Sequence, residues 1–264
     1  MTDFNKDQIY QNQLTHIPKF EFNQAVANVF DDMVQRSIPF YDQIHRIIID
    51  LVQRFKYKDQ DELIIYDLGC STATTIEILL QALCLSEASP KQVKIIGVDQ
   101  SKPMIEKATQ KLKAYSSNNY ELHCQDLNEI DFQTADMVIM NYTLQFISVG
   151  KRVDLLTKIF RALKPGGLFL LSEKIKTDNP FFEELFIELY YDFKRGNGYN
   201  ELEISQKREA LENVLVPLTP AQQLEFMSQA GLQNVEMLFR WYNFASFLGI
   251  KPHAQIPRNS YPIQ

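Results

Sequence analysis

The stretch Leu63-Ile64-Ile65-Tyr66-Asp67-Leu68-Gly69-Cys70-Ser71 decides the fold of this 264-residue chain. Its apolar run is typical of a buried strand, and the glycine that follows predicts a tight turn into a helix. A second apolar run closes at Asp99, thirty residues after Gly69. Two strands that end in this way predict a nucleoside-binding crevice at the carboxyl edge of a parallel sheet, where a carboxylate accepts both ribose hydroxyls.

Strand and helix patterns alternate around this stretch. Near-continuous apolar runs separated by helical periodicity predict an α/β fold, with a mostly parallel sheet covered by helices on both faces. Residues 23–55 predict two earlier helices, separated at Ser37-Ile38-Pro39. Lys164-Pro165-Gly166-Gly167 predicts a helix stop and a turn. The expected strands are 63–67, 93–99, 120–125, 137–141, 167–172, 235–241 and 243–250, and the expected helices between and after them are 74–85, 101–113, 150–163 and 220–230.

One segment does not fit the alternation. Residues 173–218 are too long for an ordinary connection between a strand and a helix, and their apolar spacing is helical. Because this insertion follows a strand at the carboxyl edge, we expect a lid or a dimerisation element; the alternative is a helical addition that only thickens the core. We expect one domain over 21–250, a loosely held arm over 1–20 and a flexible tail over 251–264.

Composition excludes several classes of function. A formal net charge of −6 offers no basic surface for phosphates, so we expect no direct nucleic-acid binding. The three cysteines (Cys70, Cys84 and Cys124) lack zinc spacing, and the four histidines lack metal-ligand spacing, so no metal is expected. No apolar run approaches the length of a membrane span and no signal segment opens the chain, which favours a cytoplasmic location without membrane partners.

The turn after the first strand indicates the ligand. Only Gly69 follows that strand, whereas a pyrophosphate requires close backbone approach at several glycines. The crevice therefore favours a nucleoside without phosphates over NAD, and S-adenosyl-L-methionine (SAM) is the foremost candidate. We expect its amino-acid end over 69–71 and its ribose on Asp99.

Other strand ends supply further candidate contacts. Asp67 is suited to the ligand's ammonium group, Asp126 to the adenine amino group and Asn141 to the methionine portion. Taken singly, a strand-end Asp is more often a helix cap or turn former. Four polar strand ends in one sheet favour SAM binding. Ser101, two positions before Pro103, is instead expected to cap a helix.

Basic pairs inside the insertion do not fit a plain methyl-donor site. Lys194-Arg195 and Lys207-Arg208 stand out in an acidic chain. A cation ~4 Å from a sulfonium, at an effective dielectric constant near 20, meets a repulsion of about 4 kcal/mol before screening. A carboxylate between the two cations turns that cost into a gain, so the pairs suggest an anionic substrate or an anionic group on the product. The alternative is a solvated helix face.

The motifs together resemble a known family. The most specific is residues 192–208, Asp-Phe-Lys-Arg-Gly-Asn-Gly-Tyr-Asn-Glu-Leu-Glu-Ile-Ser-Gln-Lys-Arg, which lies in the insertion that general superfamily members lack. With 29–41, 66–71, 141–146, 165–167 and 171–174, it resembles the carboxy-S-adenosyl-L-methionine (carboxy-SAM) synthases over roughly 20–250. The resemblance implies a Rossmann-like SAM-methyltransferase fold with a seven-stranded sheet. From the insertion we also expect a homodimer.

The resemblance also implies an enzyme that converts SAM and prephenate to carboxy-SAM and phenylpyruvate. The product would supply the carboxymethyl donor for tRNA wobble uridine modification by a separate, downstream enzyme. Arg208 would be the catalytic residue, gripping the new carboxylate in a two-pronged pair. The alternatives are a conventional small-molecule SAM-dependent methyltransferase and a catalytically idle SAM-binding scaffold. The implied ligand contacts are Tyr41, Gly69, Cys70, Ser71, Asp99, Gln100, Asp126, Leu127, Asn141 and Arg208, of which Gln100 and Leu127 depart from the family pattern.

Overall fold

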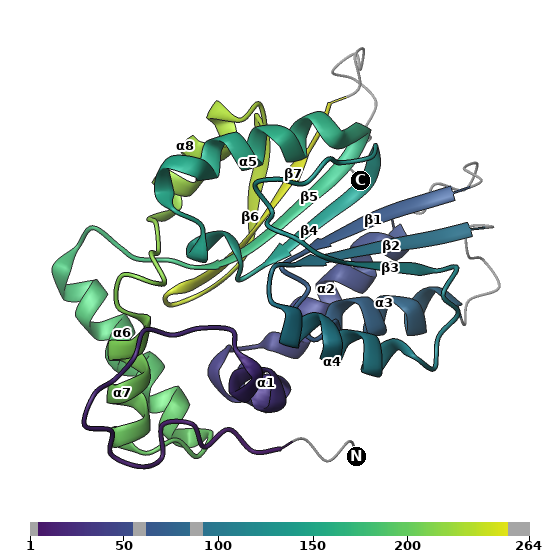
Figure 1. Ribbon diagram of the computed structural model, residues 1–264. Helices are drawn as coiled ribbons and strands as arrows, with labels where there is room; N and C mark the ends of the chain where they lie inside the picture. Colours follow the sequence, from purple (N-terminus) through teal and green to yellow (C-terminus); the bar gives the residue numbers. More distant parts are fainter. Residues whose placement is uncertain (1–4, 55–61, 85–91, 253–264) are drawn as a thin grey trace.

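A seven-stranded sheet runs through the centre of the protein in a computed structural model that describes residues 5–54, 62–84 and 92–252 (Figure 1). The strand order is β3-β2-β1-β4-β5-β7-β6. All neighbours pair in parallel except β7, which is antiparallel to both β5 and β6. The predicted mostly parallel α/β sheet is thus confirmed. The strands are β1 (Glu62–Leu68), β2 (Gln92–Asp99), β3 (Tyr120–Cys124), β4 (Ala135–Asn141), β5 (Leu163–Lys174), β6 (Asn234–Trp241) and β7 (Phe244–Ile250).

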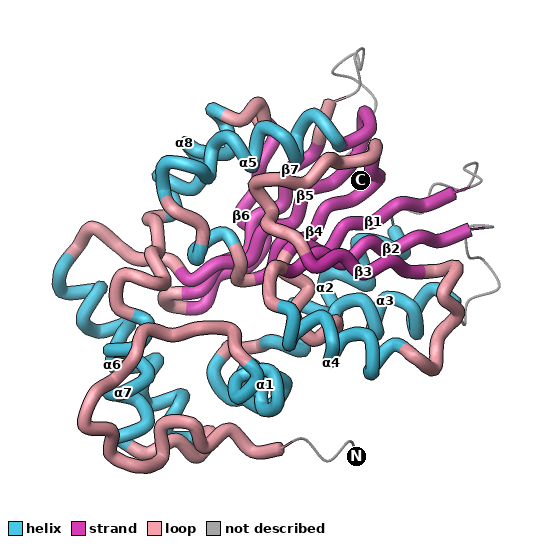
Figure 2. The backbone as a smooth tube through the Cα atoms, viewed as in Figure 1, coloured by secondary structure: helices cyan, strands magenta, loops and turns pink. Residues whose placement is uncertain are grey.

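Helices cover both faces of this sheet and bury a separate apolar core on each (Figure 2). On one face Ile48 and Ile76 pack among side chains of β1 and β2. On the other, Leu156 and Met227 join side chains from the central strands. The first face is covered by α2 (Tyr41–Arg54), α3 (Thr74–Cys84) and α4 (Lys102–Leu112), and the second by α5 (Val149–Ala162) and α8 (Pro220–Gln229).

Local signals explain where several elements begin and end. The Ser101 hydroxyl accepts a hydrogen bond from the Met104 amide at 3.3 Å, so the predicted cap of α4 is confirmed. Helix α5 ends before Lys164, as expected. The expected turn over 164–167 is instead a bulge within β5, because the pairing jumps from Ala135–Leu163 to Met137–Leu168.

The insertion folds into two helices beside the carboxyl edge of the sheet, α6 (Pro180–Gly196) and α7 (Glu201–Leu211), which lie near α1 (Gln24–Ser37) (Figure 1). We call α6 and α7 the lid. A capping box between Asn200 and Glu203 opens α7.

The N-terminal arm packs against the lid, so the expectation of a loosely held segment is wrong for residues 5–20 (Figure 2). Asp7 is buried and its Oδ2 accepts a 2.7 Å hydrogen bond from the Tyr199 hydroxyl. Gln206 Nε2 donates to the carbonyls of Tyr10 and Asn12. Residues 1–4 of the arm and 253–264 of the expected tail lie outside the described residues. Within the described ranges, no helix combines the length and apolar content that crossing a membrane requires.

Candidate functional site

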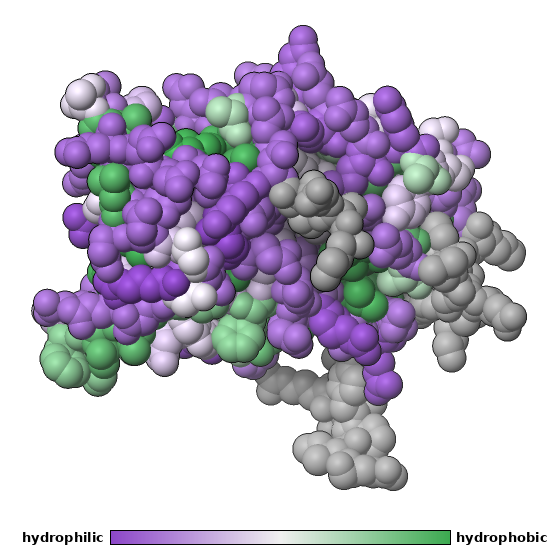
Figure 3. Space-filling view, turned by 90° about the horizontal axis from the view of Figure 1, so that it is seen from below, coloured by the Kyte–Doolittle hydropathy of each residue, from purple (hydrophilic) through white to green (hydrophobic). Residues whose placement is uncertain are grey.

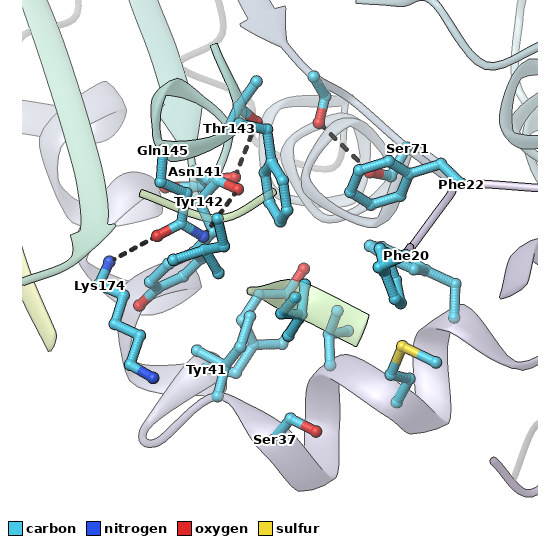
Figure 4. A pocket seen from close by; sticks show the side chains of 18 of the residues that line it. Phe20, Phe22, Ser37, Tyr41, Ser71, Asn141, Tyr142, Thr143, Gln145 and Lys174 are labelled. Carbon is cyan, nitrogen blue, oxygen red and sulfur yellow. Dashed lines mark hydrogen bonds between the residues drawn. The ribbon is translucent and has the colours of Figure 1, made fainter. Parts of the chain in front are cut away.

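A cavity of about 770 Å³ opens at the carboxyl edge of the sheet, between the strand ends, α1 and the lid (Figure 4). Its lining includes all ten residues that were expected from the sequence to contact the ligand: Tyr41, Gly69, Cys70, Ser71, Asp99, Gln100, Asp126, Leu127, Asn141 and Arg208. Asp67, the eleventh candidate, lines the same cavity. The sheet topology therefore gathers residues that are up to 167 positions apart in the sequence (Tyr41 to Arg208).

The turn after β1 needs a glycine for two reasons. Gly69 has a φ of +75°, and a Cβ at this position would lie 2.1 Å from Thr143 Oγ1. The amides of Gly69 and Cys70 both donate to the Val98 carbonyl, at 2.8 and 3.1 Å. Ser71 also has a positive φ, of 49°. A strained, close turn of this kind is common where backbone must approach a ligand.

Asp99 organises the neighbouring strand end. Its Oδ2 accepts from the Ser71 amide at 3.0 Å and its Oδ1 from the Ser101 amide at 2.8 Å. Burial raises the pKa of this carboxyl, and the two hydrogen bonds oppose that rise. Each carboxylate oxygen can accept more than one hydrogen bond, so both remain able to receive ribose hydroxyls.

Asp67 and Asn141 are among the cavity residues that carry buried polar atoms without a hydrogen-bond partner in the described protein. Asp67 is 2% exposed and its Oδ2 has no hydrogen-bond partner there; burial and, secondly, Asp99 raise its pKa to about 7. Both amide atoms of Asn141 are likewise unpartnered. Buried polar groups without partners are costly and rare. A ligand carrying an ammonium and a carboxylate, as the amino-acid end of SAM does, would satisfy both side chains.

Tyr41 and Asp126 extend the site on either side. The Tyr41 ring packs edge-on against His45, with centroids 4.5 Å apart, and burial, followed by Asp67, raises the pKa of its hydroxyl. Asp126 Oδ1 accepts from the backbone amide and the side chain of Asn128, at 2.8 and 2.7 Å. Asp126 is thus a turn former that also lines the cavity.

The basic pairs of the lid divide between the cavity and the surface. Lys194 and Lys207 are 4% and 6% exposed and line the cavity, which contradicts a solvated face for these two. Arg195 is exposed and paired with Asp192 and Glu201. Arg208 also lines the cavity, but it is exposed to solvent. Its guanidinium forms no ion pair or hydrogen bond with the described residues.

Sequence reasoning missed several cavity residues. Lys174 ends β5 at the same sheet edge as Asp67 and Asn141, so the strand-end argument applied to those two would have found it. Phe20, at the end of the arm, and Phe22, just after it, reach the cavity (Figure 4). No local signal marks the arm residues, because their position depends on packing against a lid that follows much later in the chain.

The fold is shared with known methyltransferases. A family model described as a methyltransferase domain matches residues 66–169. The crystal structure of human N-acetylserotonin methyltransferase in complex with SAM superposes with a TM-score of 0.55 at 16% identity, covering 87% of this chain and 56% of that one. The chain therefore has the fold of the SAM-dependent methyltransferases.

Sequence relatives narrow this class. The carboxy-S-adenosyl-L-methionine synthase of Actinobacillus pleuropneumoniae serotype 5b is 42% identical over 248 residues, covering 94% of this chain and 100% of the relative. The enzyme of that name from Desulfotalea psychrophila is 42% identical over 253 residues, covering 96% and 99%. The chain belongs to the carboxy-S-adenosyl-L-methionine synthase family.

Proposed function

We propose that the protein converts SAM and prephenate to carboxy-SAM and phenylpyruvate. The methyl carbon of SAM exchanges a proton for a carboxylate. Prephenate supplies that carboxylate as carbon dioxide and releases its ring hydroxyl as hydroxide, which takes up the proton as water. Atoms and charge balance without an external oxidant or base. Family membership and the geometry of the cavity support this reaction.

The position of Arg208 is the main support for this proposal. It lines the cavity that also holds Asp67 and Asn141, and no carboxylate of the described residues neutralises it. A guanidinium beside a sulfonium is unfavourable for a plain methyl donor, whereas a carboxylate grafted next to the sulfur can form a two-pronged pair with it. The cation thus favours carboxy-SAM over transfer of an unmodified methyl group.

The remaining residues have roles in holding SAM under this proposal. Asp67 receives the ammonium, Asp99 the ribose and Asp126 the adenine amino group, while Asn141 faces the methionine portion. Tyr41 offers an aromatic face to the sulfonium. The arm and the lid limit the access of water, which would otherwise compete for the carbon dioxide.

The test is incubation of the protein with SAM and prephenate, followed by mass spectrometry of adenosine-containing products. We expect carboxy-SAM from the wild type, and loss of it with retained SAM binding in Arg208→Leu. Arg195→Leu is the matched control, since Arg195 does not line the cavity and should leave product formation unchanged. Full carboxylation by Arg208→Leu, or S-adenosylhomocysteine with a methylated acceptor from the wild type, would contradict the proposal.

We further propose that carboxy-SAM passes in the cytoplasm to a separate tRNA-modifying enzyme as its carboxymethyl donor. The net charge of −6 supports a division of labour in which this protein does not itself hold tRNA. A salt-sensitive mobility shift of tRNA at micromolar protein would overturn this division.

We also propose that two copies associate through the lid. Phe181 and Phe182, in the first turn of α6, are 68% and 46% exposed. The molecular face seen in Figure 3 is mostly hydrophilic, with separate hydrophobic patches. Exposed aromatic pairs of this kind are typical of interaction sites. Light scattering should report a dimer, and a monomer at working concentration would contradict it.

A further inference from the structure

Three lysines from separate elements line one part of the cavity wall. Lys174 ends β5, Lys194 lies near the end of α6 and Lys207 lies in α7. Lys194 and Lys207 are buried and Lys174 is half-buried. Buried lysines are rare unless their charge is paired. Each of these ammonium groups therefore needs a negatively charged partner.

The described protein supplies little negative charge to this cluster. No carboxylate of the described residues lies within 4.0 Å of the ammonium of Lys174 or Lys194, and neither ammonium donates a hydrogen bond to them. Lys207 Nζ donates to Ser37 Oγ at 3.3 Å and lies 3.7 Å from Asp7 Oδ2. Among the described residues, Asp7 is thus the one carboxylate within 4.0 Å of any of the three ammonium groups. Glu183 and Glu203 act on Lys174 and Lys194 only from farther away.

Aromatic rings hold the three ammonium groups near one another. The Tyr190 ring centroid is 4.8 Å from Lys174 Nζ and 5.8 Å from Lys194 Nζ. The Tyr199 centroid is 5.2 Å from Lys194 Nζ and 5.6 Å from Lys207 Nζ. These contacts attract cations weakly. They position the ammonium groups without neutralising them.

The pKa values of the three lysines are lowered, because the ammonium groups are buried with little negative charge nearby. Burial, then Lys207 and Lys174, lowers the pKa of Lys194 to about 7. Burial also lowers the pKa of Lys174 to about 8, and of Lys207 to about 8 despite Asp7. A ligand that brought two negative charges would reverse these effects, because each ammonium would gain a counter-ion.

We propose that Lys174, Lys194 and Lys207 form a subsite that binds the two carboxylates of the co-substrate and selects cyclic dicarboxylates over monocarboxylates. This inference rests on the proposed function and deepens it. Arg208 holds the carboxylate once it is attached to SAM, whereas the lysines hold the donor beforehand. Phenylpyruvate carries a single carboxylate, so the same subsite binds the product more weakly than the substrate and favours its release.

The test is calorimetric titration of prephenate and of phenylpyruvate into the protein saturated with S-adenosylhomocysteine. The variants are Lys174→Met and Lys194→Met, which keep the apolar stem and remove the charge. Lys176→Met is the matched control, because Lys176 is exposed and does not line the cavity. Lys194→Arg restores the charge.

The wild type and Lys176→Met should bind prephenate at least about 10-fold more tightly than phenylpyruvate. Lys174→Met and Lys194→Met should each raise the Kd for prephenate about 10-fold, or about 1.4 kcal/mol, and leave the Kd for SAM within about 2-fold. Lys194→Arg should recover part of the loss. A merely structural role predicts the opposite pattern: a lower Tm in the Met variants with no change in either Kd.

Failure of the two proposals can be told apart. If the wild type makes carboxy-SAM but both Met variants keep the wild-type Kd for prephenate, the lysine subsite is wrong and the proposed function stands. If the wild type makes no carboxylated product from SAM and prephenate, the proposed function is wrong and the lysine subsite is overturned with it.

Discussion

At the residue scale, burial of the Asp67 carboxyl carries an electrostatic cost. Its folded-state pKa of about 7 lies above the ordinary value of 3.8 because the carboxyl is buried near Asp99. The folded protein therefore retains a proton that the unfolded chain has lost between about pH 4 and pH 7. The free energy of unfolding falls as pH rises through this window, and the cost is complete above about pH 7.

Asp67→Asn should remove this cost. One unit of pKa corresponds to about 1.36 kcal/mol, so we expect a gain in unfolding free energy on the order of 2–4 kcal/mol at pH 8 and little gain near pH 4. The same variant should bind SAM at least about 10-fold more weakly, because the ammonium loses its counter-ion. Calorimetric scans of the ligand-free protein at both pH values check the first effect. Equal changes in Tm at pH 4 and pH 8 would show that Asp67 is not the group responsible.

Gly69 offers a second residue-scale prediction. Gly69→Ala requires an L-residue at a φ of +75° and places a Cβ 2.1 Å from Thr143 Oγ1, so the turn must move. We expect a loss of about 1–3 kcal/mol in unfolding free energy and a loss of SAM binding. Gly150→Ala is the control, since a Cβ there meets nothing within 4 Å. Wild-type SAM affinity in Gly69→Ala would argue against close contact between this turn and the ligand.

At the element scale, the arm and the lid are tied by buried polar contacts. Asp7 accepts from the Tyr199 hydroxyl at 2.7 Å, while its carbonyl accepts from Arg36 Nη2 at 2.7 Å. The Arg36 guanidinium also stacks on the Tyr199 ring at 4.0 Å. These contacts join the arm to α1 and to the loop between α6 and α7. They hold the arm beside the cavity, to which it contributes Phe20.

Tyr199→Phe should loosen this element. It leaves Asp7 Oδ2 without its hydrogen bond, which costs about 1–3 kcal/mol for a buried group. We expect faster hydrogen exchange in residues 7–20 and a higher KM for prephenate. The control is Tyr115→Phe. The Tyr115 hydroxyl accepts a hydrogen bond from Gln81, away from the lid. If exchange in the arm is no faster in Tyr199→Phe than in Tyr115→Phe, this contact does not hold the arm.

At the scale of the whole molecule, the sheet topology explains what the sequence could predict. Apolar runs and strand-end polar residues are local signals, and the parallel order of β1, β2 and β4 places Asp67, Asp99 and Asn141 at one edge. The packing of Asp7 against Tyr199 was not predictable in this way, since it joins positions 192 residues apart. The lysine cluster is only partly visible in the sequence. The basic pairs stand out in an acidic chain, but only tertiary packing separates buried Lys194 from exposed Arg195.

In the proposed reaction, the ring carboxylate carbon of prephenate becomes attached to the methyl carbon of SAM. The most direct measurement is mass spectrometry of adenosine-containing products after incubation with SAM and prephenate isotopically labelled in its ring carboxylate. We expect the wild type to form carboxy-SAM that carries the label, and Arg208→Leu to form none. S-adenosylhomocysteine together with a methylated acceptor, or a carboxylated product without the label, would contradict the proposed reaction.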